Sequence, residues 1–292
     1  MRLLILGGTG LLSHMVWRRA YARGLDVVAT VRTRPDVPGI PAGARAIDAV
    51  DVRQDGVLDR VLDRAAPDVV INAVGVTKAL VPVVGEADTR RINAGFPHAL
   101  ASASARRGCR VIQVSTDCVF SGSRGSYTEA DAPDPVDVYG QSKLDGEIAD
   151  PHVLTIRTSM VGPELAGQTG LLAWFLAQRG GRVAGFTHAR FSGLSTPVLA
   201  DALLDEALRA PGLRGLYHLA GPPIDKCSLL RLLDDAFEAG VTIDPRVEPR
   251  IDRTLDGSRF AAATGFVPPS WRDMVSGLRA AHDARELRRV QA

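Results

Sequence analysis

The sequence predicts an α/β protein, with a Rossmann-type doubly wound parallel sheet and a smaller C-terminal α/β region. Short apolar runs alternate with longer amphipathic ones through the first 161 residues. The runs are rich in Val and Ile, which is typical of strands buried on both faces of a parallel sheet. A glycine-rich loop directly follows the first run, and right-handed crossovers then give the doubly wound arrangement.

The expected elements follow this alternation along the chain. Apolar, β-branched composition marks six strands, and helical spacing of apolar residues marks four intervening helices. The strands are Arg2–Leu6, Asp26–Val31, Arg45–Ala49, Asp68–Ala73, Arg110–Ser115 and Val153–Thr158. The helices are Ser13–Arg23, Gln54–Ala65, Glu86–Arg107 and Tyr139–Ala149.

After about residue 162 the alternation loosens, and Gly and Pro pairs punctuate the chain. We expect residues 1–161 to form a dinucleotide-binding domain. Residues 162–292 are expected to bind substrate over the carboxyl edge of the sheet, with segments that return to the Rossmann core. The expected elements here are helices Val198–Leu208, Ser228–Phe237 and Trp271–Arg289, and the strand Gly215–Leu219.

Composition excludes several classes of protein. The chain has 292 residues, 46% hydrophobic and 23% charged, as in an ordinary soluble domain. A net charge of +2 gives no argument for a nucleic-acid or membrane partner. Three scattered cysteines disfavour a disulfide framework or a metal site and suit the cytoplasm. The apolar start ends at Gly7, too early for a signal peptide. A homodimer is possible.

The glycine loop is the first chemical signal. Gly7-Gly8-Thr9-Gly10-Leu11-Leu12-Ser13 runs from the first strand into a helix. Glycines let a pyrophosphate approach the backbone, and the amino end of the helix stabilises its charge. Ser13 replaces the usual third glycine but is still small. We therefore expect Gly7, Thr9, Gly10, Leu11 and Leu12 to bind a dinucleotide.

The end of the second strand indicates which dinucleotide. An acidic residue there would bind the ribose 2′-hydroxyl of NAD, but the chain reads Ala29-Thr30-Val31-Arg32-Thr33-Arg34. Thr30 and Arg32 could hold the 2′-phosphate of NADP(H), unless the arginines are simply solvated loop charges. Further contacts are expected at the ends of the following strands, from Asp51, Val52, Ala73, Val74 and Gly75.

A hydroxyl pair and a Tyr–Lys pair suggest carbonyl–alcohol redox chemistry. Ser115 and Thr116 end a strand, and Tyr139 and Lys143 lie four residues apart on the next helix, so they share one face. Lys143 is expected to lower the pKa of Tyr139, because a nearby positive charge favours the phenolate. Such a phenol can exchange a proton with a substrate oxygen.

Together these segments resemble the extended short-chain dehydrogenase/reductases, in particular the dTDP-4-dehydrorhamnose reductase-like branch. The segment from Val114 to Gly122 resembles that branch's Ser-Thr-Asp-Tyr-Val-Phe-Asp-Gly motif. The run from Tyr139 to Glu147 resembles its Tyr-Gly-x-Ser-Lys-Leu-x-Gly-Glu motif. Departures are Cys118, Ser121 and Met160, where the branch has tyrosine, aspartate and commonly tryptophan.

The resemblance implies a mechanism and a substrate class. NADPH would reduce the 4-keto group of a nucleotide-linked deoxysugar, for polysaccharide or natural-product synthesis. Tyr139 would be the general acid, Lys143 would hold the nicotinamide ribose, and Thr116 would orient the carbonyl, with Ser115 as the neighbouring alternative and a cofactor contact. Asn93 stands where the family carries a structural asparagine beside the cofactor. No metal is expected.

Two other readings stay open at this stage. A nucleotide-sugar epimerase or dehydratase would recycle its cofactor, although a dehydratase commonly has a glutamate where Cys118 stands. The chain also resembles a non-catalytic, NADP-binding regulatory subunit, the beta subunit of methionine adenosyltransferase. The retained Thr116, Tyr139 and Lys143 favour an enzyme. Arg190 could pair with a diphosphate or lie exposed in solvent.

Overall fold

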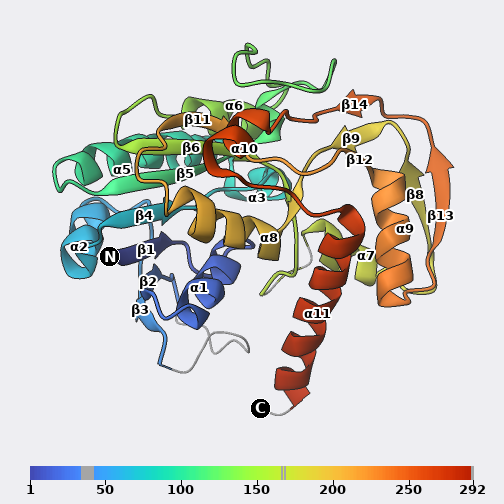
Figure 1. Cartoon of the computed structure of the whole chain (residues 1–292), viewed down its shortest axis with the longest axis horizontal. Coiled ribbons are helices and arrows are strands. Elements are labelled where there is room, and N and C mark those ends of the chain that lie inside the picture. Colours follow the sequence, from blue (N-terminus) through green and yellow to red (C-terminus); the bar gives the residue numbers. More distant parts are fainter. Residues whose placement is uncertain (34–42, 166, 168, 291–292) are drawn as a thin grey trace.

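The computed structural model describes residues 1–33, 43–165, 167 and 169–290. Its centre is a parallel sheet of seven strands in the order β11-β6-β5-β4-β1-β2-β3 (Figure 1). This is the Rossmann order, so the predicted fold class is confirmed. The strands are β1 (Arg2–Leu6), β2 (Asp26–Thr30), β3 (Arg45–Ile47), β4 (Val69–Asn72), β5 (Arg110–Thr116), β6 (Val153–Thr158) and β11 (Gly215–His218).

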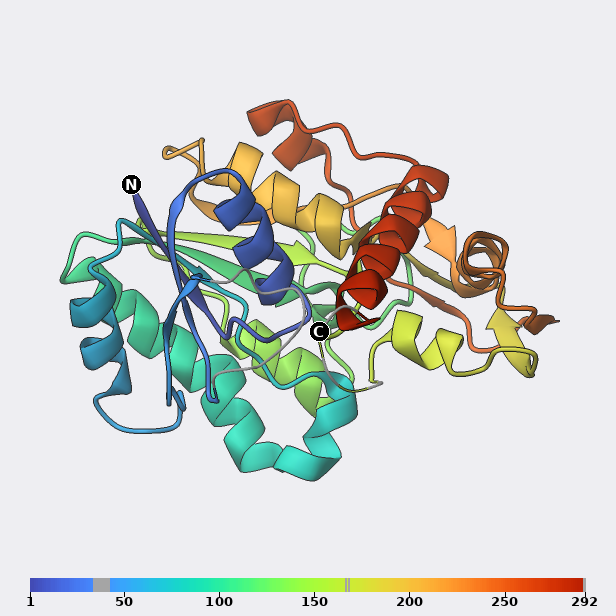
Figure 2. The ribbon, with the colours of Figure 1, turned by 90° about the horizontal axis from the view of Figure 1, so that it is seen from below.

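Each face of the sheet has its own hydrophobic core, because successive strand residues point to opposite sides. Leu3 and Ile5 of β1 belong to one core, and Leu4 and Leu6 belong to the other. Helices α1 (Ser13–Ala22) and α8 (Thr196–Asp201) contribute to the first, and α2 (Val57–Ala65) and α5 (Phe96–Ala105) to the second. Figure 2 separates these layers, with the blue α1 on one side and the teal α5 on the other.

The C-terminal half adds three small sheets beside the main one (Figure 1). They pair β7 (Met160–Val161) with β10 (Leu194–Ser195), and β8 (Arg182–Phe186) with β13 (Thr242–Arg246). The third joins β9 (Ala189–Phe191), β12 (Ile224–Asp225) and β14 (Ile251–Asp252). The helices here are α7 (Leu171–Leu176), α9 (Lys226–Phe237), α10 (Ser258–Thr264) and α11 (Trp271–Val290).

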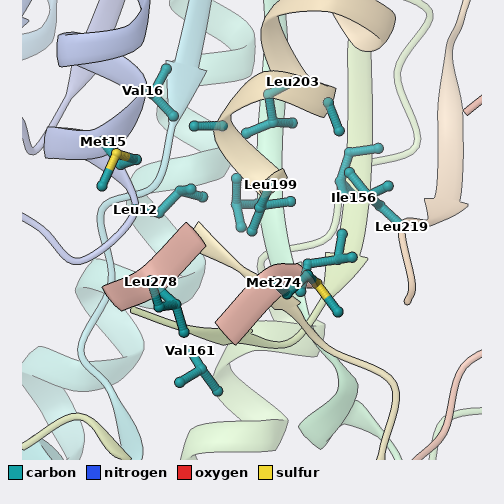
Figure 3. Close-up of a cluster of buried hydrophobic side chains, with 14 of the residues drawn as sticks. Leu12, Met15, Val16, Ile156, Val161, Leu199, Leu203, Leu219, Met274 and Leu278 are labelled. Carbon is teal, nitrogen blue, oxygen red and sulfur yellow. The ribbon is translucent and has the colours of Figure 1, made fainter. Parts of the chain in front are cut away.

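The two halves share one core. Figure 3 shows Leu12 and Val16 of α1 in the same cluster as Leu199 of α8 and Met274 of α11. In addition, β11 pairs with β6 and so extends the main sheet from the C-terminal half. The last helix is also fixed at its start, since the Trp271 indole donates to the Pro222 carbonyl oxygen at 2.7 Å.

Several expected helices differ from those observed. The helix predicted at Val198–Leu208 is α8 followed by a π-helical segment Ala202–Ala207, and the helix predicted at Gln54–Ala65 begins at Val57. The single helix predicted at Glu86–Arg107 is instead α4 (Glu86–Arg90), a π-helical segment Arg91–Gly95 and α5. The helix predicted at Tyr139–Ala149 is α6 (Val138–Asp145), which ends at Gly146. Short helices Lys78–Leu80 and α3 (Val81–Val84) precede α4. Among the described residues, no helix is both long and apolar enough to cross a bilayer.

Candidate active site

The glycine loop turns between β1 and α1 as expected. Gly7 has φ +74°, and a Cβ there would lie 2.9 Å from Val74 Cγ2, so the position requires glycine. Ser13, in place of a third glycine, donates its hydroxyl to the Leu6 carbonyl oxygen at 3.3 Å and ties the helix to the strand. The Leu12 side chain lies in the core, so only its backbone could face a phosphate.

Two of the expected 2′-phosphate contacts lie at the end of β2. Thr30 is buried, and its hydroxyl accepts a hydrogen bond from the Gly7 N–H at 3.0 Å. The Thr30 hydroxyl therefore supports the glycine loop in this structure, and its contact with a 2′-phosphate stays a prediction. Arg32 is exposed at the strand end, while Arg34 lies outside the described residues.

Asp51 lies in a cluster of cations at this corner. Arg53 forms an ion pair with it at 2.7 Å, and the hydrogen bonds from Arg53 lower the pKa of Asp51 to about 2, with Arg32 contributing through its charge. Val52 is half-buried beside it. The carboxylate is thus held by arginines. Arg53 belongs to no recognisable sequence motif. The turn after β3 places it at this corner.

The residues after β4 meet the π-helical segment. Asn93 is fully buried, accepts from the Val76 N–H at 2.8 Å and donates to the Ser142 hydroxyl at 3.0 Å. It therefore locks the segment that follows Ala73, Val74 and Gly75 to helix α6. A Cβ on Gly75 would lie 3.2 Å from Asn93 Oδ1 and 3.9 Å from Lys143 Nζ. The Lys143 ammonium is thus beside the end of β4.

Two glycines let α6 pack closely on its neighbours. A Cβ on Gly140 would clash with the carbonyl oxygen of Cys118, just after β5, and one on Gly146 would clash with the Asn93 carbonyl oxygen in the π-helical segment. The Asp137 side chain caps the helix by accepting from the Gly140 N–H at 2.8 Å. The glycines of the Tyr-Gly-x-Ser-Lys-Leu-x-Gly-Glu motif are therefore positions of backbone contact.

Ser115 and Thr116 point in opposite directions, as neighbours on a strand do. The Thr116 hydroxyl accepts from the Cys118 N–H and donates to Asp117 Oδ1, each at 3.2 Å. The Ser115 hydroxyl instead donates to Glu147 Oε1 at 2.7 Å. Ser115 is thus engaged on the other side of β5, and the alternative that its hydroxyl orients the carbonyl is disfavoured.

Tyr139 and Lys143 do not affect each other as expected. Burial raises the pKa of Tyr139, the charges of Cys118 and Asp117 add to this, and a hydrogen bond with Thr116 opposes it. The Lys143 ammonium donates to the Val114 carbonyl oxygen at 2.7 Å, and the net direction of the Tyr139 pKa is upward. Burial lowers the pKa of Lys143 to about 8. The expectation that Lys143 lowers the tyrosine pKa is thus wrong for this structure.

A cavity of about 330 Å³ lies at the end of β5, next to Thr116 in the chain. Asp117 and Cys118, directly after Thr116, line it from the Rossmann half. Three cations, Arg190, Lys226 and Arg253, line it from the C-terminal half. Its apolar lining comes from Met160, Val161, Leu171, Phe186, Ala189, Phe191, Pro249 and Ile251.

The charged groups of the cavity differ in how they are held. Arg190 pairs with Asp252 at 3.2 Å, and Arg253 Nε donates to the Phe120 carbonyl oxygen at 2.8 Å. Burial lowers the pKa of Lys226, and the nearby Asp117 opposes that shift. Burial also raises the pKa of the Cys118 thiol to about 12, so it is no nucleophile at neutral pH.

Sequence reasoning missed Lys226 and Glu147 as candidate functional residues. Lys226 begins α9, 87 residues after Tyr139, and no motif surrounds it. Glu147 lies within a recognised motif, yet its role depends on Arg157, which comes from the next strand. Only the folded chain brings these groups to the site.

A seven-stranded Rossmann sheet with a glycine loop and a Thr, Tyr and Lys after β5 defines an extended short-chain dehydrogenase/reductase. The chain belongs to the family described as the RmlD substrate binding domain, which matches residues 1–281. It is 34% identical to the dTDP-4-dehydrorhamnose reductase of Mycobacterium tuberculosis over 233 residues, which cover 75% of this chain and 69% of that relative.

Solved structures share the fold. The dTDP-4-dehydrorhamnose reductase of Bacillus anthracis in complex with NADP has a TM-score of 0.79 at 18% identity, with 96% of this chain and 99% of that chain covered. UDP-glucose 4-epimerase of Thermotoga maritima with UDP-glucose has a TM-score of 0.81 at 18% identity, with 97% and 99% covered. Because a reductase and an epimerase match equally well, the fold alone does not distinguish the two activities.

Proposed function

We propose that this protein is an NADPH-dependent reductase of a nucleotide-linked 4-keto-6-deoxysugar, similar to the dTDP-4-dehydrorhamnose reductases. The observation that carries the proposal is one continuous site. Thr116 ends β5, Lys143 Nζ lies beside Gly75 after β4, and Asp117 and Cys118, directly after Thr116, line a cavity together with three cations. The nicotinamide of the cofactor and the carbonyl of a diphosphate-linked sugar can therefore meet at the hydroxyls of Thr116 and Tyr139.

The glycine loop, Arg32 and the residues after β4 fit a dinucleotide, which when bound would supply the hydride to the sugar carbonyl. Tyr139, whose pKa stays high, keeps its proton and gives it to the carbonyl oxygen as general acid. Thr116, which contacts Tyr139, orients that oxygen. Lys143 holds the ribose beside Gly75. Asn93 keeps Lys143 and the end of β4 in register through Ser142.

The choice of NADPH rests on the corner formed by Arg32, Asp51 and Arg53. We expect Arg32→Ala to weaken NADPH binding about tenfold and NADH binding much less, because a guanidinium contacts the 2′-phosphate that only NADPH carries. Titration of cofactor fluorescence measures both dissociation constants. Equal weakening of the two cofactors would contradict the assignment.

The cations of the cavity fit a substrate diphosphate. We expect Lys226→Ala to raise KM for the nucleotide sugar about tenfold and to leave NADPH affinity unchanged, since Lys226 lies on the substrate side of the site. Arg209→Ala is the control, because that exposed cation pairs with Asp205 outside the cavity lining. An unchanged KM in the Lys226 variant would remove this contact from the proposal.

The assignment is tested by incubating the protein with NADPH and a panel of nucleotide-linked 4-ketosugars. Loss of nicotinamide absorbance in a 1:1 ratio to the reduced sugar supports the reductase. Conversion of a nucleotide sugar without net NADPH consumption identifies an epimerase or dehydratase instead. NADPH binding without any turnover across the panel supports a regulatory subunit.

The reaction divides between the two parts of the chain. We assign cofactor binding to residues 1–161 and most of the substrate binding to residues 162–292. Reduced cysteines at all three positions are consistent with a cytoplasmic reaction, in polysaccharide or deoxysugar natural-product synthesis. A homodimer stays a prediction that sedimentation or light scattering can test.

A further inference from the structure

A buried ion pair lies directly behind the proposed catalytic residues. Arg157 on β6 donates from Nε to Glu147 Oε1 at 2.8 Å and from Nη2 to Glu147 Oε2 at 2.7 Å. The Arg157 side chain is 3% exposed and that of Glu147 is 12% exposed. Such a pair is bidentate and charge-assisted, so its geometry is well fixed.

Further contacts immobilise the arginine. Its guanidinium lies 5.1 Å from the centre of the Phe120 ring, and Nη1 lies 3.4 Å from His218 Nε2. His218 is fully buried, and its backbone N–H donates to Glu129 Oε1 at 2.8 Å. Arg157 is therefore a fixed support for the Glu147 carboxylate.

Glu147 touches the catalytic strand as well. Its Oε1 accepts from the Ser115 hydroxyl at 2.7 Å, and Ser115 immediately precedes Thr116. The carbonyl oxygen on the other side of Ser115, that of Val114, accepts from Lys143 Nζ at 2.7 Å. One carboxylate thus braces the stretch of β5 that holds both Lys143 and Thr116.

The position of Glu147 is unfavourable for stability alone. It follows the C-terminal end of α6, one turn after Lys143, where the helix dipole disfavours negative charge. Burying a carboxylate also has a desolvation cost, and an ion pair often does no more than offset it. A buried carboxylate at this unfavourable position suggests that Glu147 acts on the neighbouring Lys143 ammonium.

We infer that Glu147 is a positioning residue for the reduction, held by Arg157 and Ser115 with its negative charge one helical turn from the buried Lys143 ammonium. This inference rests on the proposed function. In that function Lys143 contacts the cofactor and Thr116 contacts the substrate. Glu147 contacts neither of them directly and acts only through Lys143 and Thr116. Sequence motifs mark the residue but assign it no such task.

The electrostatics of Lys143 agree with this geometry. Burial lowers the pKa of Lys143 to about 8, and the Glu147 charge opposes the shift. Removing that charge lowers the pKa of Lys143 further. Lys143 then loses its proton at a lower pH, and activity that needs the ammonium falls earlier as pH rises.

The test is the pH profile of kcat/KM with NADPH and the nucleotide 4-ketosugar that the native protein reduces. We expect activity of the native protein to fall above about pH 8, and Glu147→Gln to move this limb down by about one pH unit. Glu147→Asp keeps the charge, so its limb should stay near the native position even if kcat falls. Glu238→Gln, at the exposed end of α9 outside this network, is the matched control and should leave the limb unmoved.

The outcomes separate two failures. If Glu147→Gln lowers kcat at every pH without moving the limb, the residue is merely structural and the inference is wrong. If the native protein reduces no 4-ketosugar, the proposed function itself has failed. Should Glu147→Gln fold poorly because Arg157 is left unpaired, the double variant E147Q/R157Q removes both buried charges, and an unmoved limb there also overturns the inference.

Discussion

Tyr139→Phe is expected to lower kcat by about 10²–10⁴-fold, the usual contribution of a positioned general acid. The phenol is the group whose proton reaches the new alcohol, and phenylalanine keeps the ring but has no proton to give. NADPH affinity should stay close to that of the native protein, because the glycine loop, Arg32 and Lys143 are untouched. Stopped-flow or steady-state NADPH oxidation measures the loss.

Tyr217→Phe is the matched control for this substitution. Tyr217 lies on β11 with its ring edge against Phe260 and the Arg259 guanidinium over it, away from the cavity lining. Its variant should turn over at the native rate. A Tyr139→Phe protein that retains most of its kcat would overturn the assignment of the acid.

Gly140→Ala is expected to reduce both activity and stability. The added methyl would clash with the Cys118 carbonyl oxygen, and neither backbone can move freely because Asp137 and Asn93 fix α6. Overpacking of this kind costs about 1–3 kcal/mol. A shift of α6 by about 1 Å would displace Tyr139 and Lys143 and can cost on the order of 10²-fold in rate.

Thermal unfolding and kcat together check this prediction. Gly277→Ala is the control, since Gly277 lies in α11 with nothing within 4 Å of its added Cβ. Alanine there should be neutral or stabilising by about 0.5–1 kcal/mol, as in other helix interiors. Native Tm and kcat in the Gly140 variant would show that α6 tolerates a wider spacing.

Local patterns explain what could be predicted from the sequence. Strands β1 and β6 begin and end where expected, because an apolar β-branched run bounded by polar or glycine residues marks both ends. The glycine loop and the Tyr139–Lys143 spacing are likewise local signals. The pairing of Gly7 with Val74 shows why the loop signal is reliable, since only glycine fits there.

The sequence-based predictions fail where the outcome depends on the direction of a side chain or on contacts with a distant segment of the chain. Ser115 was expected at the cofactor, but the phase of its strand turns the hydroxyl to Glu147. Lys226 reaches the cavity only through the packing of α9. The π-helical segment that places Asn93 was also hidden, because its residues continue the helical pattern.

The core shared by the two halves has a consequence for biosynthesis. Leu12 and Val16, near the start of the chain, are covered by Met274 and Leu278 of α11, near its end. Domains fold as units while the chain leaves the ribosome. Here the first half emerges early and covers one face of its sheet with α2 and α5, but the other face stays partly exposed until α8 and α11 have been translated. Apolar surface of the nascent chain is therefore exposed during much of translation. Truncation after residue 161 or a stalled ribosome would leave an aggregation-prone fragment.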